Sequence, residues 1–317
     1  MSELFSIVIP HWNGKDFLQP CLDALAVQTY PHIEVIIVDN ASEDGSQAYI
    51  RDYYPDVILI ELPENRGFTG ACNTGMEAAQ GTVISLLNND TEVDTNWATA
   101  IMDAFERHPD VGMVASKMML FNERDTFHTA GDGFTTDGRP FNRGVWEKDD
   151  GQYDDEVFVF SACGGSSAYR RALLDNVGLL DNDFFFLMED VDLAWRSQLA
   201  GWRVLYTPHA LVYHHLSATG GGKTASFYDG RNSIYLLIKD IPADLWRKYR
   251  GQILRRQAII AWDALRAWRG EAARAHLRGI LTGLLHIPAL LKKRRTVQAT
   301  RTVSLEYLES ILSPPQS

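Results

Sequence analysis

The stretch that decides the fold reads Val83-Ile84-Ser85-Leu86-Leu87-Asn88-Asn89-Asp90-Thr91. Its apolar first half is typical of a strand that is buried on both faces of a parallel sheet. Its polar second half then lies beyond the carboxyl end of that strand, which is where open α/β sheets bind their ligands. The carboxylate of Asp90 would be available there to a hard cation, which prefers oxygen ligands. A turn that caps a helix starting near residue 96 explains the same polar residues equally well.

Three more short apolar runs precede this stretch, at residues 5–10, 33–38 and 57–62, and each is followed by a segment with helical periodicity. The order β-α-β-α-β-α-β predicts an α/β fold, with a mostly parallel, Rossmann-like sheet, right-handed crossovers and helices on both faces. Parallel strands bring their carboxyl ends to one edge of the sheet. Polar residues follow three of the four strands, so we expect a single site at that edge.

A second acidic cluster occurs later in the chain. The apolar run at residues 184–188 leads directly into Glu189, Asp190 and Asp192 at the start of an expected helix. A helix N-terminus stabilises negative charge, so these carboxylates are also explained as ordinary first-turn residues. We expect a long segment of loops at residues 121–153, with a short hairpin near residue 137. Further strands are expected within residues 111–120, 157–160, 202–206 and 210–213, with a glycine-containing loop at residues 161–167.

The composition is that of a soluble globular protein. Of 317 residues, 45% are hydrophobic and 22% are charged. We expect no signal peptide, because Met1 is followed almost at once by a strand, and no transmembrane helix, because no apolar run reaches about 18 residues. Three cysteines without metal-binding spacing indicate buried thiols in a reducing compartment, which predicts a cytoplasmic protein.

Charge is distributed unevenly along the chain. The net charge is −11, yet residues 245–301 contain 14 Lys or Arg and only two acids. We therefore divide the chain into an acidic α/β domain at residues 1–226 and a basic helical region at residues 227–317. Tryptophans, an apolar face and a basic rim are typical of helices that lie on a membrane surface. The alternatives are an ordinary helical subdomain packed on the body and, less favoured, a nucleic-acid-binding tail.

Six motifs carry a family likeness. They read, in chain order, Ile9-Pro10-x-Trp12-Asn13, Val38-Asp39-Asn40-Ala41-Ser42-x-Asp44-Gly45-Ser46, Glu64-Asn65-x-Gly67-Phe68, Leu87-Asn88-Asn89-Asp90-Thr91, Phe186-Leu187-Met188-Glu189-Asp190-Val191-Asp192-Leu193-x-x-Arg196 and Tyr213-His214. The set, over about residues 5–231, resembles glycosyltransferase family 2, and within it the rhamnosyltransferases and galactofuranosyltransferases of bacterial surface polysaccharide assembly. The resemblance implies a GT-A fold, a nucleoside-diphosphate sugar donor (dTDP- or UDP-linked), Mg²⁺ or Mn²⁺, and inversion at the anomeric carbon.

The resemblance also assigns roles to residues. Asp90 matches the metal-binding carboxylate of the family's DXD motif, which here keeps one carboxylate because it reads Asn88-Asn89-Asp90. His214 matches a histidine that supplies a further metal ligand; without the resemblance it would be an ordinary core histidine. Asp190 matches the base that takes the proton from the acceptor hydroxyl, with Glu189 orienting the acceptor beside it. The remaining expected contacts are Pro10, Asn13, Asp39, Asn65, Asn73, Asn88 and Asn89 with the donor, and Gly164 and Gly165 with the sugar or the acceptor.

Two other nucleotide-binding patterns fail in this sequence. Gly222-Lys223-Thr224 ends like a P-loop, but Ser217 stands where that motif needs its first glycine. The first strand is followed by Trp12-Asn13-Gly14-Lys15, which lacks the glycine pattern of a dinucleotide-binding dehydrogenase. We therefore interpret the glycine-rich segment before Lys223 as a loop that brings this lysine to the donor pyrophosphate.

Together these patterns predict an inverting, metal-dependent glycosyltransferase that is peripheral on the cytoplasmic face of the inner membrane. It would move a sugar, rhamnose in the first place, to a glycan or lipid-linked acceptor in cell-surface polysaccharide synthesis. No nucleic-acid partner is expected, and a homo-oligomer is compatible with the sequence. The competing hypothesis is a catalytically silent module that binds a nucleotide sugar, because the metal motif has lost a carboxylate.

Overall fold

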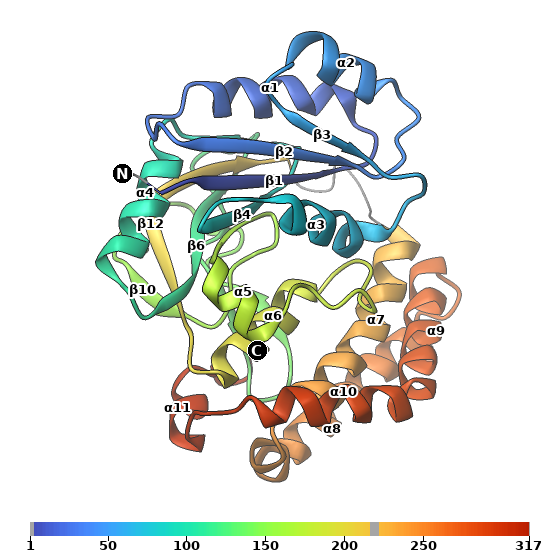
Figure 1. The fold of residues 1–317 in the computed structure, drawn as a ribbon. Coiled ribbons are helices and arrows are strands. Elements are labelled where there is room, and N and C mark those ends of the chain that lie inside the picture. The colour runs from blue at the N-terminus through green and yellow to red at the C-terminus, as the bar shows by residue number, and fades with distance from the viewer. Residues whose placement is uncertain (1–2, 216–221, 317) are drawn as a thin grey trace.

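A ten-stranded sheet forms the centre of the molecule in the computed structural model, which describes residues 3–215 and 222–316 (Figure 1). Its main path runs β10-β12-β6-β11-β4-β1-β2-β3, with β5 paired to β12 and β7 paired to β6. The strands are β1 (Phe5–His11), β2 (Ile33–Asp39), β3 (Ile58–Glu61), β4 (Val83–Leu87), β5 (Thr91–Val93), β6 (Val111–Leu120), β7 (Phe127–Thr129), β10 (Val157–Val159), β11 (Ser166–Arg170) and β12 (Arg203–His214). A separate hairpin contains β8 (Asp132–Phe134) and β9 (Pro140–Asn142), where the sequence predicts one.

The first four strands are parallel, which confirms the prediction for this half of the chain. β1 pairs with β2 and β4, and β2 pairs with β3. Figure 1 shows α1 and α2 over one face of these strands and α3 over the other. β4 is buried along its whole length between β1 and β11, which explains its nearly unbroken run of apolar side chains. The helices of the body are α1 (Lys15–Ala26), α2 (Ser46–Tyr53), α3 (Gly67–Ala78), α4 (Trp97–Arg107), α5 (Arg171–Val177) and α6 (Glu189–Leu199).

The second half of the sheet differs from the prediction in two places. Part of the expected loop at residues 161–167 belongs to β11, which is antiparallel to both β4 and β6. The hydroxyl groups of its serines form hydrogen bonds inside the protein, as between Ser116 Oγ and Ser166 Oγ at 2.9 Å. Polar residues can therefore be buried in this strand, and a search for apolar periodicity does not detect it. The two strands expected at residues 202–213 are one strand, β12. A register shift between Thr207 and Leu211 lets β12 continue along β6 past Pro208.

Five helices complete the chain: α7 (Gly222–Lys239), α8 (Ala243–Arg266), α9 (Glu271–Leu285), α10 (Ile287–Ala299) and α11 (Leu305–Ser310). α7 and α9 touch backbone to backbone, because a Cβ on Gly279 would lie 2.1 Å from the Phe227 carbonyl oxygen. Tyr235 and Leu236 of α7 belong to the same hydrophobic core as the sheet. The helical region is therefore packed tightly on the body, and the domain division at residue 226 stays a prediction.

No helix among the residues that the structure describes is both long enough and apolar enough to cross a membrane.

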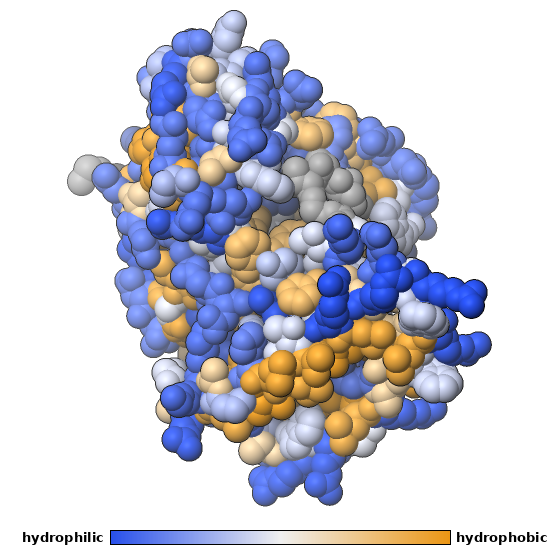
Figure 2. Space-filling model, turned by 90° about the vertical axis from the view of Figure 1, so that its right-hand side faces the viewer, coloured by the Kyte–Doolittle hydropathy of each residue, from blue (hydrophilic) through white to orange (hydrophobic). Residues whose placement is uncertain are grey.

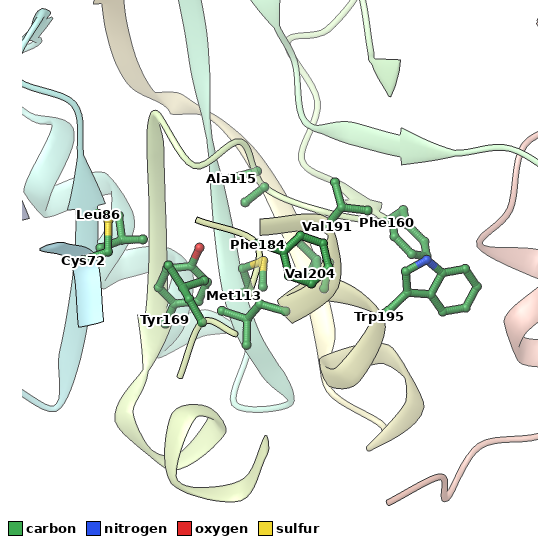
Figure 3. Close-up of a cluster of buried hydrophobic side chains, with 14 of the residues drawn as sticks. Cys72, Leu86, Met113, Ala115, Phe160, Tyr169, Phe184, Val191, Trp195 and Val204 are labelled. Atoms are coloured by element: carbon green, nitrogen blue, oxygen red, sulfur yellow. The ribbon is translucent and has the colours of Figure 1, made fainter. Parts of the chain in front are cut away.

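One of the two hydrophobic cores fixes the position of α6. Figure 3 shows Trp195 of α6 beside Phe160, with their ring centroids 4.9 Å apart and the rings inclined by 70°. Phe134 of the hairpin completes this buried aromatic group, at 5.1 Å from Trp195. Aromatic packing of this geometry adds to the stabilisation that burial alone supplies. The core thus holds the amino end of α6, which carries Glu189 and Asp190, in one place.

A buried cation also joins α7 to α6. The ammonium of Lys239, which is 2% exposed, lies within ion-pair distance of Asp181 and of Asp192 on α6. Replacing Lys239 by methionine removes the cation that joins the two carboxylates and leaves Asp192 with Arg196 and Asp181 with Lys293, so we expect a loss of about 3 kcal/mol in the free energy of unfolding. Urea denaturation measures this quantity.

Lys248→Met is the matched control. Lys248 pairs with Glu309 at the surface of α8, with about half of its side chain exposed, and such a pair contributes at most about 1 kcal/mol. Equal losses in the two variants would contradict the structural role given to Lys239.

Candidate active site

A cavity of about 420 Å³ opens at the carboxyl edge of β1, β2 and β4. The strand ends form one wall, and residues 185–190, the end of β12 and the first turns of α7 form the other. The convergence of polar strand ends that we expect at this edge is what the structure shows; the roles of the individual residues remain predictions. Ten of the expected site residues line the cavity: Pro10, Asn65, Asn88, Asn89, Asp90, Gly164, Gly165, Glu189, Asp190 and His214.

Asn40 joins the ends of β2 and β3 at the rim of this cavity. Its side-chain amide donates to Asn65 Oδ1 and to the Gly67 carbonyl, both at 3.0 Å, and its own Oδ1 accepts from the Arg66 N–H at 2.8 Å. Asn40 belongs to the motif that begins at Val38, but the sequence did not identify it as a site residue. Asn40 therefore fixes the orientation of the Asn65 side chain at the cavity wall.

Asp39 and Asn13 lie behind the cavity wall and do not line it. Asp39 Oδ1 accepts from the Ser42 N–H at 3.0 Å and from Gln47 Nε2 at 2.8 Å. Its other oxygen is buried without a hydrogen-bond partner among the described residues. Asn13 Oδ1 accepts from the Glu43 N–H at 3.0 Å. Both side chains order the turns at the strand ends, and the unpartnered oxygen of Asp39 leaves one acceptor for a ligand that enters there.

Asn73 and Lys223 also lie away from the cavity wall. The amide of Asn73 donates to the Leu180 carbonyl at 2.8 Å and accepts from the Leu180 N–H at 3.0 Å, so it anchors a loop of the body. Lys223 is exposed in the first turn of α7 and lines a separate surface hollow with residues of α8 and α9. The glycine-rich loop that we expect before Lys223 falls mostly on residues 216–221, which lie outside the described residues. In this structure Lys223 is therefore not placed at the cavity where the sequence leads us to expect it.

Asp90 and His214 form a close pair on the cavity wall. Asp90 Oδ1 lies 3.1 Å from His214 Nε2, and both side chains are almost fully buried. This spacing is that of a direct hydrogen bond and is also compatible with two ligands of one cation, so the residue types carry the match to Mg²⁺ or Mn²⁺. One carboxylate oxygen and one imidazole nitrogen leave the other positions to phosphate oxygens and water. The chemistry of the pair thus suits the expected divalent cation.

A second group with metal-ligand chemistry extends behind the cavity wall, because Cys163 and Asp190 line the cavity and Asp132 does not. Ligand atoms of Asp132, Cys163 and Asp190 all lie within 4.8 Å of one another. Burial, followed by the nearby charges of Asp132 and Asp190, raises the pKa of the Cys163 thiol well above its ordinary value. A protonated thiol is a poor ligand for a hard cation, which favours Asp90 and His214 as the metal ligands.

His128 and His11 are site residues that the sequence did not reveal. His128 Nδ1 lies 3.1 Å from His214 Nδ1, so one ring donates and the other accepts. Burial and then the neighbouring His214 lower the pKa of His128 to about 3, which makes it neutral. When His214 presents its Nε2 lone pair to a cation, its Nδ1–H donates to His128, which fixes the ring. His11 Nδ1 contacts the Asn89 amide at 2.8 Å, and its buried Nε2 has no partner among the described residues.

The backbone before α6 is bent to present Asp190. Phe185, Leu187 and Met188 all have positive φ angles, of 63°, 67° and 67°, which strains non-glycine residues. Asn232 of α7 holds this bend, because its buried amide donates to the carbonyls of Phe184, Phe186 and Leu187 at 2.7 to 3.1 Å. The helical region therefore contributes to the site, which no motif in the sequence indicated.

The two carboxyl groups at the start of α6 are in a desolvating environment. Asp190 Oδ2 accepts from the Gly164 N–H at 2.8 Å, and Oδ1 accepts from the Val191 N–H at 2.8 Å. Burial raises the pKa of Asp190 in spite of these bonds. Burial and then the neighbouring Asp190 raise the pKa of Glu189 to about 8. Asp132 also lies close by, and burial followed by the charge of Asp190 raises its pKa to about 7. Burial thus raises the pKa of both Asp190 and Glu189 on the cavity wall, and a raised carboxyl pKa suits a general base at neutral pH.

Glu189→Gln gives a test of this raised pKa. The unfolded chain ionises Glu189 near its ordinary pKa of 4.5, whereas the folded chain holds the proton up to about pH 8. Between these values the folded state binds more protons, so this group makes the free energy of unfolding fall as the pH rises. Glutamine does not titrate, and the melting temperature of the variant relative to the parent protein should therefore increase from about pH 5 to about pH 8.

Thermal unfolding across this pH range measures the effect, with the exposed Glu77→Gln on α3 as the control. A difference from the parent protein that does not change with pH would show that Glu189 titrates normally.

Comparison with known protein families identifies the family of this chain. A family model described as "Glycosyl transferase family 2" matches residues 6–178, which is more than half of the chain. The chain belongs to glycosyl transferase family 2. It is therefore a glycosyltransferase that uses a nucleotide-sugar donor, and the cavity at the strand ends is where the motifs of the family meet.

The names of two relatives of this family 2 glycosyltransferase state an activity or a pathway. The chain is 25% identical over 302 residues to the N-acetylglucosaminyl-diphospho-decaprenol L-rhamnosyltransferase of Mycobacterium tuberculosis. This alignment covers 85% of this chain and 96% of that protein. The chain is 30% identical over 232 residues to the O-antigen biosynthesis protein RfbC of Myxococcus xanthus. This alignment covers 68% of this chain but only 17% of RfbC.

Solved structures with the same fold include two that contain Mn²⁺. The mannosyltransferase PcManGT from Pyrobaculum calidifontis, in complex with GDP-Man and Mn²⁺, matches with a TM-score of 0.56 at 17% identity, over 98% of this chain and 84% of that one. GalNAc-T7 with UDP, GalNAc and Mn²⁺ matches with a TM-score of 0.65 at 14% identity, over 93% of this chain and 55% of that one. At these identities the likeness establishes the GT-A fold and no more.

Proposed function

We propose that this family 2 enzyme is an inverting, metal-dependent glycosyltransferase that adds a sugar to a lipid-linked or polysaccharide acceptor. The observation that carries the proposal is the composition of one cavity. It contains a carboxylate and imidazole pair with metal-ligand chemistry, Asp90 with His214, together with a half-buried carboxyl group of raised pKa, Asp190. An inverting transfer needs these two elements and no nucleophilic side chain.

The proposed step is a single displacement at the anomeric carbon. Asp190 accepts the proton of an acceptor hydroxyl as the oxygen attacks the sugar. The bond between the sugar and the diphosphate breaks, and the nucleoside diphosphate leaves with the bonding electron pair. A divalent cation bound by Asp90 and His214 would neutralise the negative charge that develops on the diphosphate. The Gly164 N–H and the bend held by Asn232 keep the Asp190 carboxylate aimed at the acceptor.

The donor side of the cavity offers amides and an aromatic ring. Asn65, Asn88 and Asn89 supply donors and acceptors at the strand ends, and Trp12, which is 47% exposed, forms part of the same wall. An exposed ring at a nucleotide site can stack on a base, and His11 Nε2 is a further buried group for the donor. Neither feature selects a sugar. Rhamnose is proposed on the relative from Mycobacterium tuberculosis.

A surface on the helical region supports a membrane-bound acceptor. Figure 2 shows an apolar surface across the lower part of the molecule, bordered by hydrophilic side chains. Of the fifteen exposed large apolar side chains among the described residues, nine form what we call the apolar band: Leu254, Ile259, Trp262, Leu265, Trp268, Leu281, Leu284, Leu285 and Leu291. Arg255, Arg266 and Lys292 of the same helices have no ion-pair partner in the described part of the chain. Apolar and tryptophan side chains beside unpaired cations suit a surface that rests on an anionic membrane.

A thermal-shift screen of nucleotide sugars, with and without Mn²⁺, tests the proposed activity. We expect a dTDP- or UDP-linked sugar to raise the melting temperature, and to raise it more in Mn²⁺, because a ligand that binds only the folded state stabilises it. The screen would contradict the proposal if no nucleotide sugar stabilised the protein under either condition.

A further inference from the structure

A second hollow lies between the start of α7 and the turn that joins α8 to α9. It has a volume of about 680 Å³ and is lined by Lys223, Leu265, Trp268, Glu271, Arg274, Leu277 and Arg278. We call it the helical hollow. Its apolar side chains are the kind that cover hydrocarbon, and three cations outnumber the single Glu271, so it fits a ligand with an anionic head and an apolar tail.

The cations of the helical hollow are available to a ligand. Neither Lys223 nor Arg278 forms an ion pair or a side-chain hydrogen bond with any described residue, and both are exposed. Arg274 is engaged differently, because its guanidinium donates to the carbonyls of Trp268 and Arg269 at 3.1 and 2.6 Å. Arg274 thus holds the turn between α8 and α9, and the side chains of Lys223 and Arg278 remain available to a phosphate.

The helical hollow adjoins both the apolar band and the catalytic cavity. Leu265 and Trp268 belong to the band and also line the hollow. On the other side, Lys223 lines the hollow while Thr224, the next residue of α7, lines the catalytic cavity. Consecutive Cα atoms are about 3.8 Å apart, so the first turn of α7 lies between the two spaces. A lipid that enters from the band would have its head group beside the site of sugar transfer.

We propose that the helical hollow binds the diphosphate and the first isoprenoid units of the lipid-linked acceptor. Lys223 and Arg278 contact the diphosphate, and Leu265, Trp268 and Leu277 cover the hydrocarbon. The inference rests on the proposed function, because it specifies the acceptor of that reaction. It also gives Lys223 a role on the acceptor side, where the structure places it, in place of the expected contact with the donor pyrophosphate.

Binding of farnesyl diphosphate to the full chain tests the proposal, with titration calorimetry in EDTA so that no cation recruits the diphosphate to Asp90. The intact protein should bind farnesyl diphosphate at least about tenfold more tightly than farnesol or inorganic pyrophosphate. Arg278→Gln should weaken this binding about tenfold, the usual effect of losing one charge-assisted contact. Arg247→Gln removes the same charge from an exposed position on α8 outside the hollow and should change the affinity less than about twofold.

Two further arms separate the lipid sources. Vesicles of phosphatidylcholine and of phosphatidylglycerol show whether Arg278→Gln alters general membrane binding, and Trp268→Ser should weaken farnesyl diphosphate but not pyrophosphate. The proposal would be overturned if farnesol bound as tightly as farnesyl diphosphate, or if the two arginine variants weakened farnesyl diphosphate binding equally. It would also be overturned if Arg278→Gln weakened only the binding of phosphatidylglycerol vesicles and not that of farnesyl diphosphate. A protein that is stabilised by nucleotide sugars but does not bind farnesyl diphosphate would overturn this inference while leaving the proposed function intact.

Discussion

Asp190→Asn should lower kcat for sugar transfer by about 10²–10⁴-fold, which is the usual contribution of a positioned general base. The side chain keeps its size and can still meet the Gly164 N–H through its carbonyl oxygen, but it can no longer accept a proton from the acceptor. Binding of the nucleotide sugar should persist, because the donor-side amides and Asp90 are unchanged. Steady-state transfer kinetics and donor binding by calorimetry, measured on the same preparation, separate the two effects.

Asp175→Asn is a suitable control, since this exposed carboxylate of α5 forms no contact with the cavity. The result also tests whether Asp190 is needed for sugar transfer and not for binding of the donor. If Asp190→Asn transferred sugar as fast as the parent protein, Asp190 would not be the base.

Asp90→Asn and His214→Ala should each weaken Mn²⁺ binding in the presence of nucleoside diphosphate, and Asp90→Asn should reduce transfer by about two to three orders of magnitude. The carboxylate supplies the only negative charge of the pair, so its removal lowers cation affinity more than removal of the imidazole does. The loss of electrostatic stabilisation of the leaving diphosphate corresponds to several kcal/mol. Mn²⁺ titrations followed by electron paramagnetic resonance measure affinity directly, and chelation by EDTA should reduce transfer in the parent protein.

His215→Ala is the matched control for His214→Ala. His215 is the next residue, but its ring stacks on Phe121 with centroids 3.5 Å apart and does not line the cavity. We expect it to leave Mn²⁺ affinity within about twofold of the parent value. An equal loss in the two histidine variants, or an Asp90→Asn protein that binds Mn²⁺ normally, would remove this pair as the metal site.

The site is shared between the α/β body and the helical region, which affects how variants should be interpreted. Asn232 is completely buried in α7, yet its amide holds the strained bend before Asp190. Arg231 adds contacts of 2.6 Å to the carbonyls of Asp183 and Phe184. If Asp190 is the base, as we propose, changes in α7 should lower kcat without touching a substrate, because they release the backbone that holds Asp190.

Much of the fold could be predicted, because its signals are local. The alternation of apolar strands with amphipathic helices gives the parallel half of the sheet directly, and parallel pairing collects the polar ends of β1, β2 and β4 at one edge. The antiparallel β11 could not be predicted in this way. Its Ser166 and Ser167 carry no period-two apolar pattern, and they are strand residues only because two neighbouring strands satisfy their backbone.

The stretch at residues 83–91 shows where the sequence is sufficient and where it is not. The sequence alone determined that an apolar strand ends in Asn88, Asn89 and Asp90, since burial and strand period depend on residue type and spacing. Only the tertiary structure decided which partners meet Asp90. His214 arrives from β12 at 3.1 Å, and His128 reaches His214 because β7 pairs with β6. Contacts between residues so far apart in the chain depend on sheet topology, and no local pattern encodes them.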